Sequence, residues 1–121
     1  MNLDFNTLRQ VNVKRCETVF HKLDDWSLSD WATAMAGECG EACDVVKKIR
    51  RLDGVDKAID TSARRNKLKR DLGKELADAI CYIDLLAARA GINLSDVVVD
   101  KFDEVSDRRG SDIKLGEHLI F

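Results

Sequence analysis

The sequence predicts an all-α protein, a bundle of four to five helices formed by a single domain over residues 1–121. The chain contains no proline, so long uninterrupted helices are permitted throughout. Apolar residues recur at helical spacing along most of its length, and a charged fraction of 35% suits helices with strongly charged outer faces. A chain of 121 residues can also bury a core without disulfide staples.

Composition excludes several classes of function. The net charge of −2 gives no electrostatic footprint for duplex nucleic acid. No apolar run approaches the roughly 20 residues of a membrane span, and the N-terminus lacks a signal-peptide core, so we expect a cytoplasmic protein with no membrane partner. The four cysteines form no CxxC motif and only two histidines accompany them, which favours small buried thiols over a zinc site.

The first expected helix runs from Asn2 to Leu23, and Asn12 interrupts its apolar stripe. A short connection follows. In it, Ser27 and Asp30 have the spacing of a capping box for the next helix.

The second expected helix, from about Leu28 to Arg51, carries the first informative acids. Its apolar side is formed by Trp31, Met35, Ala42, Val45 and Ile49. Glu38 falls in the middle of that apolar arc and Glu41 at its edge. Because burying an unpaired carboxylate is costly, these glutamates need a compensating partner, and a metal ion serves several acids at once.

The third expected helix repeats the arrangement. It follows a loop from Leu52 to Arg65, runs from Asn66 to Ala90, and ends at Gly91. Glu75 and Asp78 stand three residues apart beside its apolar stripe. If the two long helices pack antiparallel, four carboxylates face one or two hard cations, for which we expect Mg²⁺ with Mn²⁺ as the alternative.

The last expected helix runs from Asp96 to Arg109, with Ser95 as its N-cap and Gly110 at its end. Residues 111–121 form a tail. Its apolar end, Leu119 to Phe121, is expected to dock on the body or on a neighbouring subunit.

Three segments together resemble one known family. GECGEACDVVKK (37–48), GKELADAICYIDLLAARAGINL (73–94) and KFDEVSDRRGSDIKL (101–115) are similar to the MazG-like nucleotide pyrophosphohydrolases of the all-α NTP pyrophosphatase superfamily. The resemblance implies Mg²⁺-dependent hydrolysis of a (d)NTP to (d)NMP and pyrophosphate, through attack of a metal-activated water on the α-phosphorus. The implied metal ligands are Glu38, Glu41, Glu75 and Asp78, and Glu41 rather than Glu38 is the better candidate to orient the water. Gly37 departs from the family pattern, which often has a further glutamate there.

The resemblance also implies a substrate site and an assembly. The candidate phosphate-binding residues are Lys47, Lys48, Lys101, Arg108 and Arg109. Trp26 and Trp31 are candidates to stack on the base; Trp31 also fits a core position, so Trp26 is the better platform. Family members assemble as dimers or tetramers, so we expect a homodimer or homotetramer. Two alternatives stay open: a non-catalytic nucleotide-binding or helical interaction module, and a phosphohydrolase for another pyrophosphate-linked metabolite.

Overall fold

The computed structural model describes residues 2–119 and confirms the all-α class. Its α-helices are α1 (Phe5–Arg15), α2 (Leu28–Leu52), α3 (Ser62–Arg89) and α4 (Leu94–Arg108). A π-helical turn (Cys16–Phe20) and two 3₁₀ turns (Leu23–Asp25 and Gly116–His118) complete the described secondary structure. None of the helices in this part of the chain is long and apolar enough to cross a membrane.

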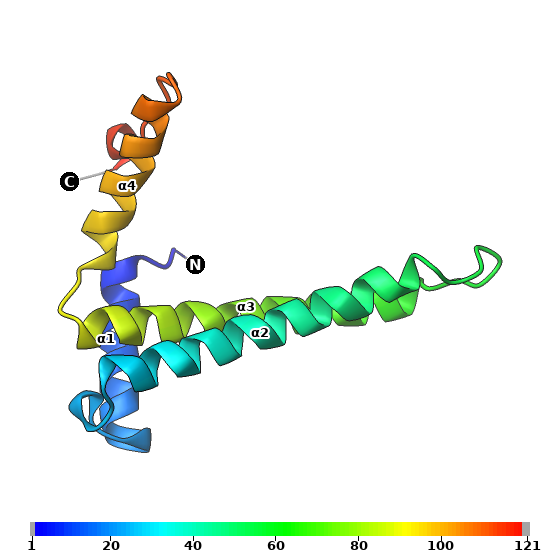
Figure 1. The fold of residues 1–121 in the computed structure, drawn as a ribbon, viewed down its shortest axis with the longest axis horizontal. Helices are drawn as coiled ribbons and strands as arrows, with labels where there is room; N and C mark the ends of the chain where they lie inside the picture. Colours follow the sequence, from blue (N-terminus) through cyan, green and yellow to red (C-terminus); the bar gives the residue numbers. More distant parts are fainter. Residues whose placement is uncertain (1, 120–121) are drawn as a thin grey trace.

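The four helices form an L rather than a parallel bundle (Figure 1). Helices α2 and α3 pair as a long antiparallel hairpin, and α1 crosses one end of it. Helix α4 leaves the same end in another direction. The connection between α2 and α3 lies at the far tip of the hairpin, so it does not cover the end where α1 packs.

The first predicted helix is shorter than the sequence indicated. Helix α1 ends at Arg15, and the chain widens into the π-helical turn, in which the His21 amide donates to the Cys16 carbonyl at 2.9 Å. The wider turn changes the phase of the side chains. Val19 and Phe20, assigned to the apolar stripe from 3.6-residue periodicity, are therefore 68% and 69% exposed.

Local capping signals explain where α2 begins. The Asp30 amide donates to Ser27 Oγ at 3.1 Å, and the Ser27 amide donates to Asp30 Oδ2 at 3.0 Å. This reciprocal pair confirms the predicted capping box. Helix α3 begins at Ser62, four residues before the predicted Asn66.

The predicted N-cap of α4 is wrong. Asn93, not Ser95, caps this helix, and its Oδ1 accepts from the Asp96 amide at 3.2 Å. Asn is at least as good a cap as Ser, and Ser95 then falls inside the first turn. The helix ends are as predicted: Gly91 and Gly110 have φ of 72° and 70°, where glycine carries no steric penalty.

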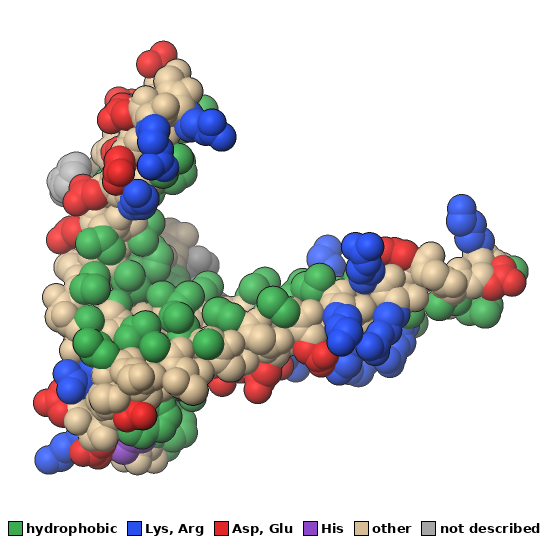
Figure 2. Space-filling view, viewed as in Figure 1, with side chains coloured by type: hydrophobic (Ala, Val, Ile, Leu, Met, Phe, Trp, Pro, Cys, Tyr) green, Lys and Arg blue, Asp and Glu red, His purple; other side chains and the backbone are tan. Residues whose placement is uncertain are grey.

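The core is small and lies where α1 crosses the hairpin. Trp31 is 1% exposed and packs with Cys16 and Leu85. By contrast, Leu76 and Ile80 on α3 are 50% and 49% exposed, although the sequence places Leu76 on the buried stripe. Figure 2 shows apolar side chains gathered along the hairpin and around the inner corner of the L.

The C-terminal tail folds back on α4. The amides of Leu115 and Gly116 donate to the Asp103 carboxylate at 2.6 and 3.3 Å. Leu119 is 41% exposed. The rest of the apolar end that was expected to dock, residues 120–121, lies outside the described residues.

Candidate metal centre

Three of the four predicted carboxylates come together between α2 and α3. Glu38, Glu41 and Glu75 each offer an oxygen, and these oxygens all lie within 4.8 Å of one another. The i,i+3 spacing puts Glu38 and Glu41 on one side of α2, and the antiparallel pairing of the helices brings Glu75 opposite them. Among residues 2–119, no Lys or Arg forms an ion pair with any of the three.

The electrostatics of the cluster is repulsive. Burial and then the neighbouring Glu41 carboxylate raise the pKa of Glu38 above its usual 4.5. A carboxyl hydrogen bond with Glu41, followed by desolvation, raises the pKa of Glu75 in the same direction. One oxygen of Glu38 and one of Glu75 are buried without a hydrogen-bond partner in the described structure. Such orphaned acceptors are costly unless something pairs with them.

Asp78 lies at the border of the cluster. It is exposed and is not one of the three acids whose oxygens converge, yet its charge contributes to the raised pKa of both Glu38 and Glu75. Asp78 also lines the adjoining cavity together with Glu38.

This donor set fits a hard divalent cation. All the converging atoms are carboxylate oxygens, which Mg²⁺ and Mn²⁺ prefer. The oxygens of Glu38 and Glu75 that lack a partner are available to coordinate a cation, and a 2+ charge would relieve the mutual repulsion of the acids. A zinc site of cysteine and histidine has no support here, because the convergent group contains neither residue.

A cavity of about 450 Å³ opens beside the acidic cluster. Acidic and aromatic residues line the same space, together with polar groups from α1. The lining residues are Asn12, Arg15, Cys16, Phe20, His21, Trp26, Trp31, Glu38, Asp78, Cys81, Tyr82 and Leu85. The lining of the cavity therefore contains both carboxylates that can hold a cation and aromatic rings.

The aromatic wall is built from mutually packed rings. The His21 ring centroid lies 4.4 Å from that of Trp26, and the Trp26 centroid 4.6 Å from that of Trp31. Trp31 is fully buried and its Nε1 donates to the Leu23 carbonyl at 3.0 Å, so its predicted core role is confirmed. Trp26 is only half-buried, so part of its ring is accessible to a ligand.

Tyr82 links the aromatic wall to the acids. Its ring lies 6.3 Å from Trp31 between centroids. Burial, followed by the charges of Glu38 and Asp78, raises the pKa of the Tyr82 phenol, so it stays protonated and can donate a hydrogen bond. Sequence reasoning missed Tyr82, although its position four residues after Asp78 on α3 places the two on one face.

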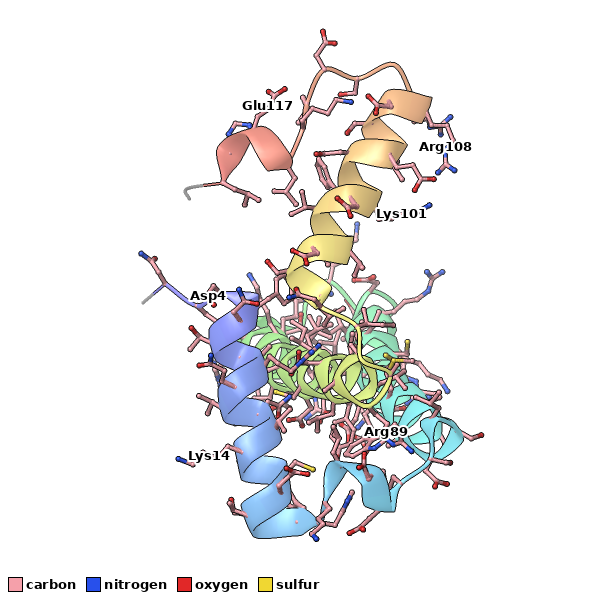
Figure 3. The ribbon with its side chains drawn as sticks, turned by 90° about the vertical axis from the view of Figure 1, so that its left-hand side faces the viewer. Asp4, Lys14, Arg89, Lys101, Arg108 and Glu117 are labelled. Carbon is pink, nitrogen blue, oxygen red and sulfur yellow. The ribbon has the colours of Figure 1, made fainter. Side chains whose placement is uncertain are left out.

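The predicted basic residues do not reach the cavity within one chain. Lys47 and Lys48 are exposed on α2, and Lys48 pairs with Asp44 at 3.3 Å. The other three lie on or at the end of α4, where Lys101 and Arg109 border a separate, mainly apolar groove. Figure 3 shows Lys101 and Arg108 on that helix, which extends away from the α2–α3 pair. Their role toward phosphate stays a prediction.

Two residues of α1 were missed as cavity residues. Arg15 is an exposed cation at the cavity, and Asn12 is a buried amide, 4% exposed. The signal for Asn12 was present in the sequence, since a buried asparagine interrupts the apolar stripe of α1. Which cavity it lines depends on how α1 crosses α3, and helical periodicity carries no information on that crossing.

The glycines beside Glu38 do not mark close helix packing within the chain. A Cβ added at Gly37 or Gly40 would meet nothing within 4 Å. Both glycines lie on the exposed side of α2, away from α3. A glutamate at position 37, where the pattern of the resembling family often has one, would therefore fit without steric conflict.

Comparison with known proteins identifies a family for the part of the chain that carries the site. The family profile described as MazG nucleotide pyrophosphohydrolase domain matches residues 27–109. This match includes α2, α3 and α4, and with them all four predicted carboxylates, whereas α1 lies outside it. No curated protein and no solved structure matches the chain.

Proposed function

Because the chain belongs to the MazG nucleotide pyrophosphohydrolase domain family, we propose that it hydrolyses nucleoside triphosphates between the α and β phosphates. The products are a nucleoside monophosphate and pyrophosphate, and the reaction requires Mg²⁺ or Mn²⁺. The substrate is a (d)NTP, with a base that enters the aromatic part of the cavity.

One observation carries the proposal: Glu38 of the acidic cluster, the neighbouring Asp78 and the aromatic wall line a single cavity. The two parts of a nucleoside triphosphate match these two kinds of residue. Its triphosphate is anionic and binds a divalent cation, and its flat base stacks on aromatic rings. Glu38 and Asp78 line this cavity together with Phe20, His21 and Trp26.

Glu38, Glu41 and Glu75 would hold the cation, with Asp78 completing the set at the cavity border. When bound, the cation supplies Lewis-acid polarisation of phosphate oxygens and lowers the pKa of a coordinated water. Glu41 is the exposed member of the three, so its carboxylate can accept a hydrogen bond from the attacking water and orient it. The Tyr82 hydroxyl can donate to an oxygen of the substrate in the same cavity.

A homodimer or a homotetramer is the proposed assembly. The chain exposes 9186 Å², against about 6,600 Å² for a compact monomer of this mass. The excess, about 2,600 Å², is larger than the roughly 800 Å² that each partner buries in a standard interface. Leu76, Ile80 and Phe102, which are 50%, 49% and 45% exposed, lie on the faces that a second copy would cover. Lys101, Arg108 and Arg109 would then meet phosphates bound in the other copy.

Hydrolysis in ¹⁸O-labelled water tests the reaction. A panel of standard and modified nucleoside triphosphates is incubated with Mg²⁺, and the products are separated and weighed by mass spectrometry. We expect monophosphate and pyrophosphate, with ¹⁸O in the monophosphate, because water attacks the α-phosphorus. Label in pyrophosphate, or stepwise release of orthophosphate, contradicts the proposal.

Matched variants distinguish the proposed catalytic function from non-catalytic nucleotide binding. Glu75→Gln removes one converging carboxylate, whereas Glu117→Gln changes an exposed glutamate in the C-terminal segment. We expect only the first to abolish turnover. If the unaltered protein binds nucleotides but never hydrolyses them, the non-catalytic nucleotide-binding alternative replaces this proposal.

A further inference from the structure

The side-chain amide of Asn12 is held in one orientation by two acceptors on α3. Its Nδ2 donates to the Cys81 carbonyl at 2.9 Å and to Asp84 Oδ2 at 3.1 Å, which uses both amide hydrogens. A flipped amide would put its oxygen against a carbonyl and a carboxylate, so the assignment of nitrogen and oxygen is forced by chemistry.

The second acceptor is itself fixed. Asp84 is 0% exposed, and its other carboxylate oxygen accepts from Arg9 Nε at 2.9 Å. An ion pair between the partly exposed Arg9 of α1 and the buried Asp84 of α3 therefore fixes the carboxylate that accepts from Asn12. This arrangement leaves Asn12 little freedom to rotate.

The Asn12 carbonyl oxygen accepts no hydrogen bond from the described residues, because both hydrogen bonds of this side chain are donated by Nδ2. Asn12 is 4% exposed and lines the cavity that contains the aromatic wall. Oδ1 is thus the one polar side-chain atom of Asn12 that is available to a ligand in this cavity. An acceptor fixed in this way is matched by a ligand that brings an N–H or O–H donor.

We propose that Asn12 selects the base of the substrate, favouring a base with an exocyclic amino group (cytosine or adenine) over one that presents only carbonyl oxygens around its imino N–H (uracil or thymine). This inference rests on the proposed function for the identity of the ligand class. The fixed orientation of Asn12 supports it: Oδ1 can only accept, so it pairs with an amino group and repels the carbonyl oxygen that uracil or thymine carries in place of that group. Arg15 is the only Lys or Arg among residues 2–119 that lines the cavity, and it is exposed.

Binding of uncleavable nucleotides tests the inference. The chain has two tryptophans, Trp26 and Trp31, and both line the cavity, so intrinsic fluorescence reports its occupation. The probes are α,β-methylene triphosphates of cytidine and of 2-pyrimidinone riboside, which differ only in the amino group, and the matching pair of adenosine and purine riboside. We expect the unaltered protein to prefer the amino member of at least one pair by roughly tenfold or more, because an analogue that lacks the group leaves the acceptor unpaired.

Asn12→Ala should reduce that preference to within about threefold, since the acceptor is gone. Asn6→Ala, on the exposed side of the same helix, should leave it unchanged. The ratio of two affinities measured on one preparation does not depend on the fraction of folded protein, so a loss of stability alone does not imitate this result. If Asn12→Ala does not fold, Asn12→Ser keeps a hydroxyl donor for Asp84 or Cys81 without the amide oxygen.

Equal binding of both members of each pair by the unaltered protein overturns the inference, as does binding of none of the probes. A preference that survives Asn12→Ala, or that is lost in Arg15→Gln instead, also overturns it. An effect of Asn12→Ala confined to discrimination between ribose and deoxyribose would assign the acceptor to the sugar and equally overturn it. Hydrolysis without a base preference leaves the proposed function in place and excludes a role of Asn12 in base selection. A base preference without hydrolysis supports the role of Asn12 and contradicts the proposed function.

Discussion

Glu41 on α2 and Glu75 on α3 face each other with carboxylate oxygens within 4.8 Å, and no Lys or Arg in residues 2–119 pairs with either. A carboxyl hydrogen bond with Glu41, then desolvation and then the charge of Glu41 raise the pKa of Glu75. A bound divalent cation would convert this pair of like charges into a stabilising contact.

Removing one charge of the cluster should stabilise the metal-free protein and inactivate it. Glu38→Gln keeps the size of the side chain but removes a like charge and an orphaned acceptor. We expect the melting temperature without metal to rise by about 2–4 °C. Pyrophosphate release should fall by roughly 100-fold or more, since even outer-shell changes at metal sites cost up to about that factor. Calorimetry in EDTA and a pyrophosphate assay measure the two effects. A melting temperature that falls contradicts the repulsion argument.

The pH dependence of stability should have the sign set by these acids. The pKa values of Glu38 and Glu75 are raised in the folded state above the usual 4.5, so the folded protein keeps protons that the unfolded chain has lost. The metal-free free energy of unfolding should therefore fall as pH rises from the usual value of 4.5 through the raised folded pKa values. Mg²⁺ should stabilise more at the higher pH, where the acids are ionised.

The comparator for this pH series is the double variant Glu38→Gln with Glu75→Gln. It should lose most of the pH slope and most of the Mg²⁺ effect, because both titrating groups are gone. Thermal unfolding followed by circular dichroism gives both quantities. An unchanged slope in the double variant would assign the pH dependence to other groups.

Much of the fold and the acidic cluster could be predicted because both depend on local rules. Helical periodicity located α2 and α3, and the spacing of Ser27 and Asp30 located the start of α2. The convergence of Glu38, Glu41 and Glu75 needs only the i,i+3 geometry and an antiparallel hairpin.

The rest of the site could not be predicted because it depends on non-local packing. Asn12 and Tyr82 become neighbours in one cavity only because α1 crosses α3. The direction in which α4 leaves the hairpin is likewise absent from helical periodicity, so the sequence could not show that Lys101 and Arg109, the predicted phosphate-binding residues, border a separate groove within one chain. The π-helical turn after Arg15 also broke the periodicity on which the α1 stripe was based.

Gly37→Ala and Gly40→Ala should each stabilise the protein by about 0.5–1 kcal/mol, the usual gain for alanine over glycine in a helix interior. A Cβ at either position meets nothing within 4 Å of the chain, so no steric cost offsets the gain. Urea unfolding measures the change. A loss of stability in either variant would mean that a second copy of the chain packs closely on that side of α2, and light scattering of the same samples would then show altered assembly.

Breaking the ion pair between Arg9 and the buried Asp84 should be strongly destabilising. Asp84 is 0% exposed and accepts hydrogen bonds from Arg9 and Asn12, so Asp84→Ala leaves a cation and an amide without their partner. We expect a loss of roughly 3–5 kcal/mol in the free energy of unfolding. Asp100→Ala, at an exposed position of α4, is the control and should change stability by less than about 0.5 kcal/mol. Equal effects of the two substitutions would show that the pair does not anchor α1.

A charge placed on the exposed apolar face should dissociate the assembly. Ile80 is 49% exposed on α3 next to Leu76, which is 50% exposed, and the chain has about 2,600 Å² more surface than a compact monomer. Ile80→Glu should shift the mass measured by sedimentation from a multiple of 13.6 kDa to 13.6 kDa itself, because burying an unpaired carboxylate in an apolar interface is costly. Lys69→Glu, also on α3 but among charged residues, should leave the assembly intact. A monomeric unaltered protein, or an Ile80→Glu variant that still assembles, would exclude this face as the interface.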